Sequence, residues 1–211
     1  MSPALGNVIQ IMSRCMFSAL NEKYDWKQIL NISFNQDCIG ELLFWKNNIF
    51  KMGPESLLLK YSIYNLFTDA SNFAAAGFIE NSDLVMHIPW LRSEASKSSI
   101  WREIKAIELC LLAFIDILRG SLVTFYTDSQ NAASILLKGS RVPELQVLAL
   151  SIFNTCRQNN VDLNTVWIPR EQNAQADFLS RIIDVDDWQT TTEFFEFLNT
   201  CGVHIQVRKY E

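Results

Sequence analysis

The spacing of apolar and polar residues changes twice along the chain. In roughly the first 60 residues the apolar positions recur every three or four residues, which indicates short helices. The stretch MGPES, residues 52–56, is a turn signal at the end of this part. From residue 62 apolar runs of strand length alternate with helical patterns, and the tail after residue 183 carries aromatic residues but no repeat. The pattern therefore predicts three parts: a helical segment at 1–61, an α/β domain at 62–183, and a C-terminal tail or linker at 184–211.

The middle part predicts five strands. They cover residues 62–69, 73–80, 84–90, 122–128 and 161–169. Asn81, Ser82 and Asp83 supply a hairpin turn between the second strand and the third. The first three strands follow one another directly and are expected to form an antiparallel meander. The last two follow helical connections, which are long enough to place them in parallel.

Helical patterns separate the later strands. The predicted helices cover residues 99–119, residues 132–137, a longer stretch that opens at Pro143, and residues 173–181. Ser99 is the expected N-cap of the first of these helices, and Gly120 is its stop signal. The order of elements is thus βββαβααβα. The predicted fold class is α/β: a five-stranded mixed sheet with helices on both faces, plus a small helical N-terminal segment.

Composition and charge narrow the function classes. Hydrophobic residues make up 49% of the chain and charged residues 19%, which is typical of a globular protein. The formal net charge is −5, so binding to nucleic acid would depend on a local basic strip. The five cysteines are scattered without a CxxC pair and far in sequence from both histidines, which argues against a zinc site or a disulfide framework. Without a basic leader or a run of about 18 apolar residues, we expect a soluble, intracellular protein with no membrane partner.

Acidic residues stand where predicted strands end and beside apolar helix positions. Asp69 ends the first strand and Asp128 the fourth, while Glu103, Glu108 and Asp177 lie on predicted helices. Taken singly, such a residue is more often a turn, cap or solvated helix residue. The set and its order support a different hypothesis, because strand ends of a mixed sheet meet at one edge and ligands gather there.

Convergence of several carboxylates would require positive charge, because they cannot all stay ionised unaided. Oxygen ligands without histidine or cysteine suit Mg²⁺ or Mn²⁺. Two such ions about 3.5–4 Å apart can clamp the attacking and leaving oxygens of a phosphodiester displacement. The pattern therefore predicts a site for two metal ions.

Four motifs add a resemblance to a known family. They are TDAS (68–71), WREIKAIE (101–108), YTDSQNA (126–132) and NAQADFLSR (173–181). In their order and their placement on strands and helices, residues 62–183 resemble the type-1 ribonuclease H domain of reverse-transcribing retroelements, most closely those of the DIRS type. The segment 1–61 resembles the end of a reverse transcriptase, a remnant of its thumb and connection. The resemblance implies a ribonuclease H-like fold, and it makes the missing polymerase part of the same polyprotein an expected partner.

The resemblance also implies the identity of the site residues. The family's four catalytic, metal-binding carboxylates fall in chain order on Asp69, Glu103, Asp128 and Asp177. Glu103 is preferred over Glu108 because the family pattern R-E-x-x-A begins one residue before Glu103. The implied cofactor is a pair of Mg²⁺ or Mn²⁺ ions.

Substrate contacts and departures from the family pattern complete the picture. Gln130 matches a position that reads the minor groove of the hybrid, and further candidate contacts are Ser71, Ser99, Arg102 and Lys105. Many relatives place a histidine in the loop before the last helix, whereas the loop here reads IPREQNAQ. Arg170 or Glu171 is the candidate to take its place. The basic handle that some relatives use to grip substrate is also missing.

The resemblance implies endonucleolytic hydrolysis of the RNA strand of RNA–DNA hybrids by two-metal-ion catalysis, within a retrotransposon reverse transcriptase. An alternative is a non-catalytic remnant of the polyprotein that binds nucleic acid or a partner chain. A 3′-exonuclease or an integrase also uses clustered acids, but neither family combines TDSQNA with NAQADFLSR.

Overall fold

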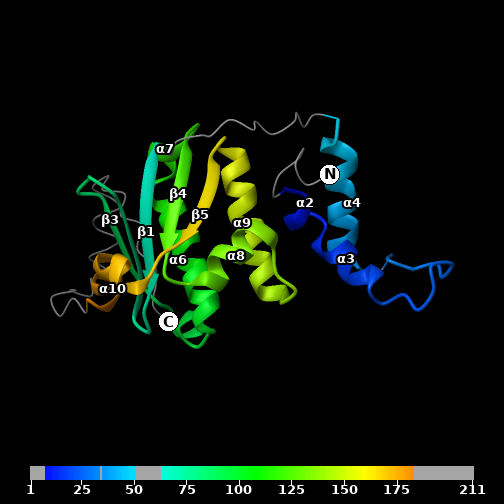
Figure 1. Cartoon of the computed structure of the whole chain (residues 1–211), viewed down its shortest axis with the longest axis horizontal. Coiled ribbons are helices and arrows are strands. Elements are labelled where there is room, and N and C mark those ends of the chain that lie inside the picture. Colours follow the sequence, from blue (N-terminus) through cyan, green and yellow to red (C-terminus); the bar gives the residue numbers. More distant parts are fainter. Residues whose placement is uncertain (1–7, 34, 51–62, 183–211) are drawn as a thin grey trace, which may run out of the picture.

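Five strands form one mixed sheet in the computed structural model, which describes residues 8–33, 35–50 and 63–182 (Figure 1). The strands are β1 (Tyr64–Ala70), β2 (Ala74–Ile79), β3 (Val85–Pro89), β4 (Leu122–Thr127) and β5 (Asp162–Trp167). Their order in the sheet is β3-β2-β1-β4-β5. The first three strands pair antiparallel, and β4 is parallel to both of its neighbours. The predicted meander and the parallel later strands are therefore confirmed.

Helices cover both faces of the sheet, as predicted. The helices of this part are α5 (Arg92–Ala95), α6 (Ser99–Ala113), α7 (Ile115–Leu118), α8 (Gln130–Lys138), α9 (Pro143–Gln158), the 3₁₀ turn η1 (Arg170–Asn173) and α10 (Ala174–Arg181). Gly77 of β2 lies against α6, because a Cβ there would be 2.7 Å from the sulfur of Cys110. Asp69 of β1 points the other way and accepts a hydrogen bond from Ser180 of α10. Since neighbouring side chains of a strand alternate between faces, α6 and α10 pack on opposite sides of β1 and β2.

Several predicted helix boundaries are wrong by a few residues. The N-cap of α6 is Ser98, whose extended backbone (φ −61°, ψ 153°) lets its hydroxyl accept from the Trp101 N–H at 3.2 Å; Ser99 is the first helical residue. Two adjacent serines give the same sequence signal, so the spacing alone selected the wrong one. The single helix expected at 99–119 is interrupted at Phe114, where φ is −110° and ψ is 11°. The last predicted helix begins instead with the 3₁₀ turn η1.

The core lies between the sheet and the helices α6, α8 and α9. Leu66, Val123 and Phe125 of the two central strands are fully buried, and so are Ile104 and Ile107 of α6. Full burial of a large apolar side chain stabilises a fold by about 1.5–3 kcal/mol. The central strands and α6 are thus held rigidly, and these are the elements from which Asp69, Asp128 and Glu103 project.

The N-terminal part consists of short helices, as predicted: α2 (Val8–Ile11), α3 (Arg14–Leu20) and α4 (Gln36–Asn48). The buried carboxylate of Glu41 in α4 accepts from the backbone N–H groups of Cys15 and Met16 at 2.8 and 2.9 Å, and so caps the start of α3. The side chain of Gln146 in α9 donates to the Ile11 carbonyl, which ties α2 to the α/β part.

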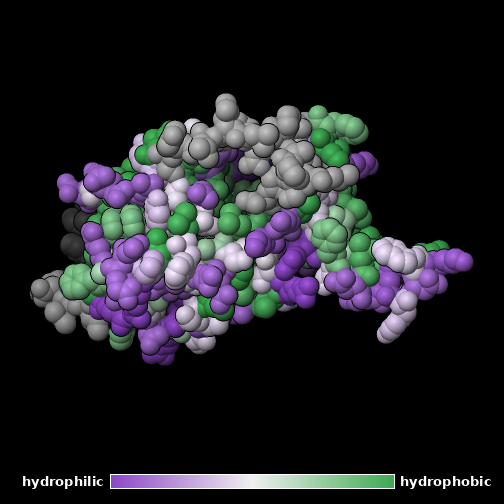
Figure 2. Space-filling model, viewed as in Figure 1, coloured by the Kyte–Doolittle hydropathy of each residue, from purple (hydrophilic) through white to green (hydrophobic). Residues whose placement is uncertain are grey.

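Apolar side chains remain exposed on the N-terminal helices. Phe17, Leu20 and Leu43 are each about half exposed, and hydrophobic residues gather over this end of the molecule in Figure 2. The predicted turn at 52–56, the boundary near residue 61 and the tail at 184–211 lie outside the described residues. Across the described ranges, every helix is too short or too polar to cross a lipid bilayer.

Candidate active site

Two strand ends bring two of the predicted acids together. In the parallel pairing of β1 and β4, Phe67 lies opposite Tyr126. Asp69 and Asp128 stand two residues beyond this pair. Asp69 is the penultimate residue of β1, and Asp128 comes directly after β4. The two carboxylates therefore leave the sheet at the same edge, where the strand ends were expected to meet.

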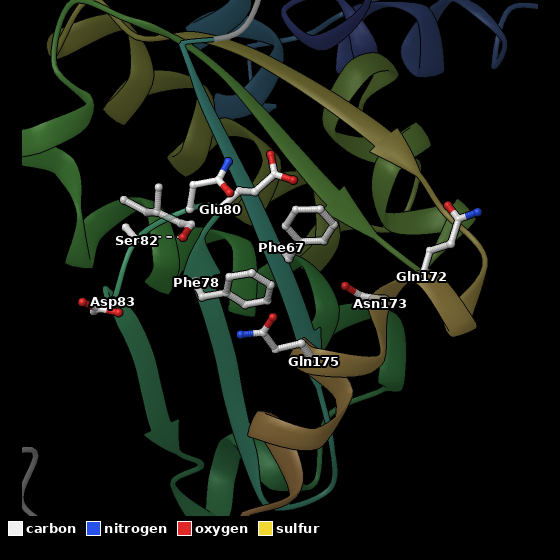
Figure 3. A pocket seen from close by; sticks show the side chains of 10 residues that line it. Phe67, Phe78, Glu80, Ser82, Asp83, Gln172, Asn173 and Gln175 are labelled. Carbon is white, nitrogen blue, oxygen red and sulfur yellow. Dashed lines mark hydrogen bonds between the residues drawn. The ribbon is translucent and has the colours of Figure 1, made fainter.

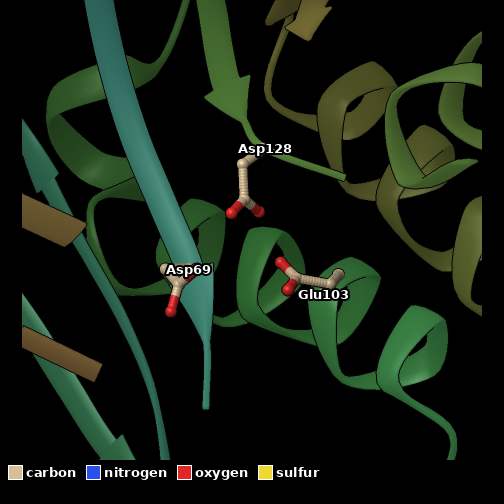
Figure 4. A group of neighbouring side chains, drawn as sticks. All are labelled: Asp69, Glu103 and Asp128. Atoms are coloured by element: carbon tan, nitrogen blue, oxygen red, sulfur yellow. The ribbon is translucent and has the colours of Figure 1, made fainter. Parts of the chain in front are cut away.

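Helix α6 supplies the third acid. Glu103 lies in the second turn of α6 and shares a helical row with the buried residues Ile107 and Cys110. Asp69, Glu103 and Asp128 converge from three separate elements (Figure 4). One ligand oxygen from each lies within 4.8 Å of the other two. Asp69 is 4% exposed and Glu103 is 7% exposed, so two of the three carboxylates are almost fully removed from water.

The pKa values of the three acids show the electrostatic strain of this arrangement. Burial raises the pKa of Glu103 well above its ordinary value, and the charges of Asp69 and Asp128 raise it further. Burial also raises the pKa of Asp69, against the opposing hydrogen bond from Ser180. The pKa of Asp128 is raised by burial as well, although the positive charge of Arg170 works against it. The surroundings therefore disfavour the ionised form of all three carboxyl groups.

The donor set fits a hard divalent cation. All three ligand groups are carboxylates, and neither histidine nor cysteine belongs to the group. Oxygen Oε2 of Glu103 is buried and has no hydrogen-bond partner within the described part of the chain. A buried, unpartnered carboxylate oxygen is costly unless something positive meets it. A cation among the three acids would satisfy this oxygen and remove the repulsion.

Asp177, the fourth predicted ligand, lies near the three acids but is engaged by arginines. Arg181 donates to both of its carboxylate oxygens at 3.0 Å, and Arg170 donates to one of them. Burial alone would raise the pKa of Asp177, but the hydrogen bonds from Arg181 and Arg170 outweigh it and lower the value. Its charge in turn raises the pKa of Asp69 and Asp128. Asp177 is thus electrostatically coupled to the cluster, and its role as a metal ligand stays a prediction.

The predicted substrate contacts fall into two groups. Ser99 and Gln130 are exposed and form the first residues of α6 and α8. Ser71 is buried, and its hydroxyl bonds to the main chain of Ala74 and Ser180. A substrate contact through that hydroxyl would require these bonds to be broken.

The two basic candidates also differ. Lys105 is bound to Glu108 at 2.6 Å, and Glu108 is itself buried and accepts from Ser151, so this pair belongs to the packing of α6 on α9. Arg102 is half-buried, and its Nε is buried without a hydrogen-bond partner in the described residues. Arg102 therefore keeps an unused donor, whereas Lys105 is already paired.

Sequence reasoning missed two residues that hold the site together. Ser180 on α10 donates to Oδ2 of Asp69 at 2.5 Å, and Asn173 donates to the Thr68 carbonyl of β1 at 2.9 Å. Both residues are almost completely buried. They stand inside the motif NAQADFLSR, so the motif named them, but only the fold shows what their side chains contact.

A pocket of about 550 Å³ lies on the same side of the sheet as α10 (Figure 3). The rings of Phe67 and Phe78 stack at 5.2 Å in its wall, and Gln172, Asn173 and Gln175 border it from η1 and α10. None of the three clustered carboxylates lines this pocket. The acid cluster combines convergent charge with a buried oxygen that has no partner in the described part of the chain, so it is the stronger candidate for chemistry.

Comparisons with known proteins give likeness at the level of solved structures. No family model matches the chain, and no curated protein matches it. The chain is similar to RNase H1 from the halophilic archaeon Halobacterium salinarum NRC-1 (18% identity, TM-score 0.44, covering 55% of this chain and 92% of that one). It is also similar to LC11-RNase H1 in complex with an RNA/DNA hybrid (21% identity, TM-score 0.43, covering 55% of this chain and 92% of that one). A third similar structure is the prototype foamy virus protease-reverse transcriptase (11% identity, TM-score 0.38, covering 75% of this chain and 22% of that one).

Likeness at this level does not establish an activity, because one fold hosts many functions. The ribonuclease H-like arrangement expected from the motifs rests on the strand order β3-β2-β1-β4-β5 with α6 and α10 on opposite faces. The candidate chemistry rests on the convergence of the three acids.

Proposed function

We propose that this chain hydrolyses the RNA strand of RNA–DNA hybrids endonucleolytically, using two Mg²⁺ or Mn²⁺ ions. The observation that carries the proposal is the meeting of Asp69, Glu103 and Asp128, which come from three different motifs of the chain. The buried Oε2 of Glu103, which has no hydrogen-bond partner among the described residues, and the raised pKa of that carboxyl group support a metal-binding role. Asp177 completes the proposed set from the neighbouring helix.

The roles of the four acids follow from their surroundings. Asp69 and Glu103 are buried and would hold the ions from inside, while Asp128 and Asp177 are partly exposed and would hold them on the side that faces substrate. Bound ions would supply Lewis acidity at the phosphorus and an activated water at neutral pH. Arg170 is exposed, and its charge reaches Asp69, Asp128 and Glu103, so it can attract a phosphate to this edge of the sheet.

Selection of RNA would come from contacts to 2′-hydroxyl groups, which a wide minor groove exposes. Ser99 and Gln130 are suited to this task because they are exposed polar residues at the start of α6 and α8, the helices next to the acid cluster. The N–H groups at a helix start also favour a nearby phosphate. Replacement of Gln130 should therefore weaken hybrid binding more than it slows the chemical step.

The proposed context is a retrotransposon reverse transcriptase of the DIRS type. The exposed apolar residues of α3 and α4 support a protein partner at this end, because exposed apolar patches commonly mark interaction sites. The polymerase part of the same polyprotein is the proposed partner.

The proposal is tested with the purified chain on labelled RNA–DNA hybrid, RNA duplex and DNA duplex, with Mg²⁺ and with EDTA. We expect internal cuts in the RNA strand of the hybrid only, with Mg²⁺ only, and none with the variant Asp128→Asn. Equal hybrid binding by both proteins without cleavage by either would favour the alternative, a non-catalytic binding module. Cleavage that survives Asp128→Asn would show that the activity does not come from this cluster.

A further inference from the structure

A buried serine, Ser180, links α10 to the acid cluster. Its hydroxyl donates to Oδ2 of Asp69 at 2.5 Å, and its exposure is 0%. Its main-chain carbonyl accepts in turn from the hydroxyl of Ser71, which follows β1. The two bonds run in opposite directions between the same two elements, so each element fixes the other.

We infer that Ser180 is a positioning residue for metal binding, which holds the Asp69 carboxylate in one orientation and reserves its second oxygen for a cation. The inference rests on the proposed function, because it concerns the same metal site. It adds a residue that the four-carboxylate set does not contain and that touches neither substrate nor metal.

The chemistry of the bond supports this role. A hydroxyl has a single proton, and Ser180 has two acceptors within reach: Oδ2 of Asp69 at 2.5 Å and the carbonyl of Asp177 at 3.0 Å. Hydrogen bonds from a hydroxyl to a carboxylate are shorter and stronger than those to neutral acceptors. The proton therefore lies toward Asp69, and one oxygen of that carboxylate is occupied while the other remains for a cation.

The position of the serine is itself fixed. Asn173 anchors the start of α10 to the Thr68 carbonyl at 2.9 Å, and Ser71 anchors its last turn. Asp69 is thus held by a group that cannot turn away, as preorganised metal ligands require. A carboxylate free to rotate would have to be ordered each time a metal binds, at a cost in affinity.

A purely structural role predicts a different outcome. Many buried serine hydroxyls only satisfy a nearby carbonyl, and their loss lowers stability without any effect on a ligand. Ser121 offers a matched control, because it is 7% exposed, its hydroxyl bonds to the Leu118 carbonyl, and it precedes β4 at the strand end opposite Asp128.

The test measures Mn²⁺ binding by calorimetry and urea unfolding in EDTA for the full chain and its variants. Ser180→Ala and Ser180→Cys should each weaken Mn²⁺ binding about 10- to 100-fold, the range typical when an outer-shell partner of a metal ligand is lost. Ser180→Thr keeps the hydroxyl and should restore most of the affinity. Ser121→Ala should lose stability in urea but bind Mn²⁺ like the unaltered chain.

The outcomes separate the inference from the function that it rests on. If Ser180→Ala and Ser180→Cys bind Mn²⁺ as the unaltered chain does while losing stability as Ser121→Ala does, Ser180 is only a packing residue and the inference is wrong. If the unaltered chain itself binds no Mn²⁺, the metal site fails and the inference falls with it. The Cys variant preserves the test in case the Ala variant does not fold.

Discussion

The substitution Glu103→Gln should stabilise the metal-free protein at neutral pH, although it removes a proposed catalytic residue. Glu103 is buried, has an oxygen without a partner among the described residues and lies close to Asp69 and Asp128, so its charge is unfavourable in the folded state. Glutamine keeps the shape of the side chain and removes the charge. A typical point substitution destabilises by about 1 kcal/mol, so a gain in stability at a buried position would be a specific signature of repulsion.

The gain in stability on Glu103→Gln has an upper limit, because a buried carboxyl group can escape repulsion by taking up a proton. From its ordinary pKa of 4.5, protonation at pH 7 costs about 1.4 kcal/mol per pH unit, or about 3.4 kcal/mol in total. Repulsion from one ionised neighbour at 4.8 Å is of the same order, about 3.5 kcal/mol at an effective dielectric constant near 20. The amide of glutamine would still lack a partner, so we expect a net gain of about 1–3 kcal/mol.

The stability effect of Glu103→Gln should depend on pH. The raised pKa of Glu103 means that the folded protein binds more protons than the unfolded chain between the ordinary and the raised value. Stability of the unaltered protein therefore falls as the pH rises through that interval. The gain from Glu103→Gln should be almost absent at pH 4 and present at pH 7.

Urea unfolding in EDTA at both pH values measures the effect, with Glu22→Gln as a control at an exposed glutamate of the N-terminal part. Excess Mn²⁺ should reverse the order at pH 7. A ligand at about 1,000 times its Kd stabilises a protein by about 4.1 kcal/mol, and the Gln variant should gain much less. A loss of stability on Glu103→Gln in EDTA at pH 7 would refute the electrostatic reasoning.

Three further predictions concern the surroundings of the site. Arg170→Gln should raise Mn²⁺ affinity about two- to fivefold at low salt, because it removes the guanidinium group that competes with a metal ion for Asp177. Calorimetry in about 0.5 M salt should show a smaller effect, and unchanged affinity at low salt would contradict the prediction. Gly77→Ala should destabilise the fold by about 1–3 kcal/mol in urea, because the new methyl group would meet the sulfur of Cys110; an unchanged midpoint would show that α6 can move aside. Asn173→Ala should cost about 1–3 kcal/mol by leaving a buried carbonyl of β1 unpaired, and hydrogen exchange should show faster opening of α10 than of α9.

The sequence pattern was sufficient for the sheet because its strands are punctuated clearly. The alternating and continuous apolar runs placed the five strands, and the connection lengths decided which pairs are antiparallel. Helix ends were harder to predict from the sequence, because Ser98 and Ser99 offer the same capping signal and only backbone geometry distinguishes them. The break at Phe114 has no sequence marker, since neither glycine nor proline stands there.

The candidate site could be predicted in part from the sequence for a similar reason. Asp69, Glu103 and Asp128 each stand at a defined place on a strand or helix, so the topology decides where they meet. The surroundings of Asp177 depend on which arginine reaches it. The spacing of Arg181 on the same helix was visible, but the approach of Arg170 depends on the 3₁₀ turn before α10.

Anomalous diffraction from a crystal of the full chain soaked in Mn²⁺ would locate the proposed metal site directly. We expect an anomalous peak within coordination distance, about 2.0–2.3 Å, of carboxylate oxygens from Asp69, Glu103 and Asp128. The variant Asp128→Asn should lose the peak. Strong Mn²⁺ peaks elsewhere on the protein, with none among these three residues, would show that the three acids do not form the metal site.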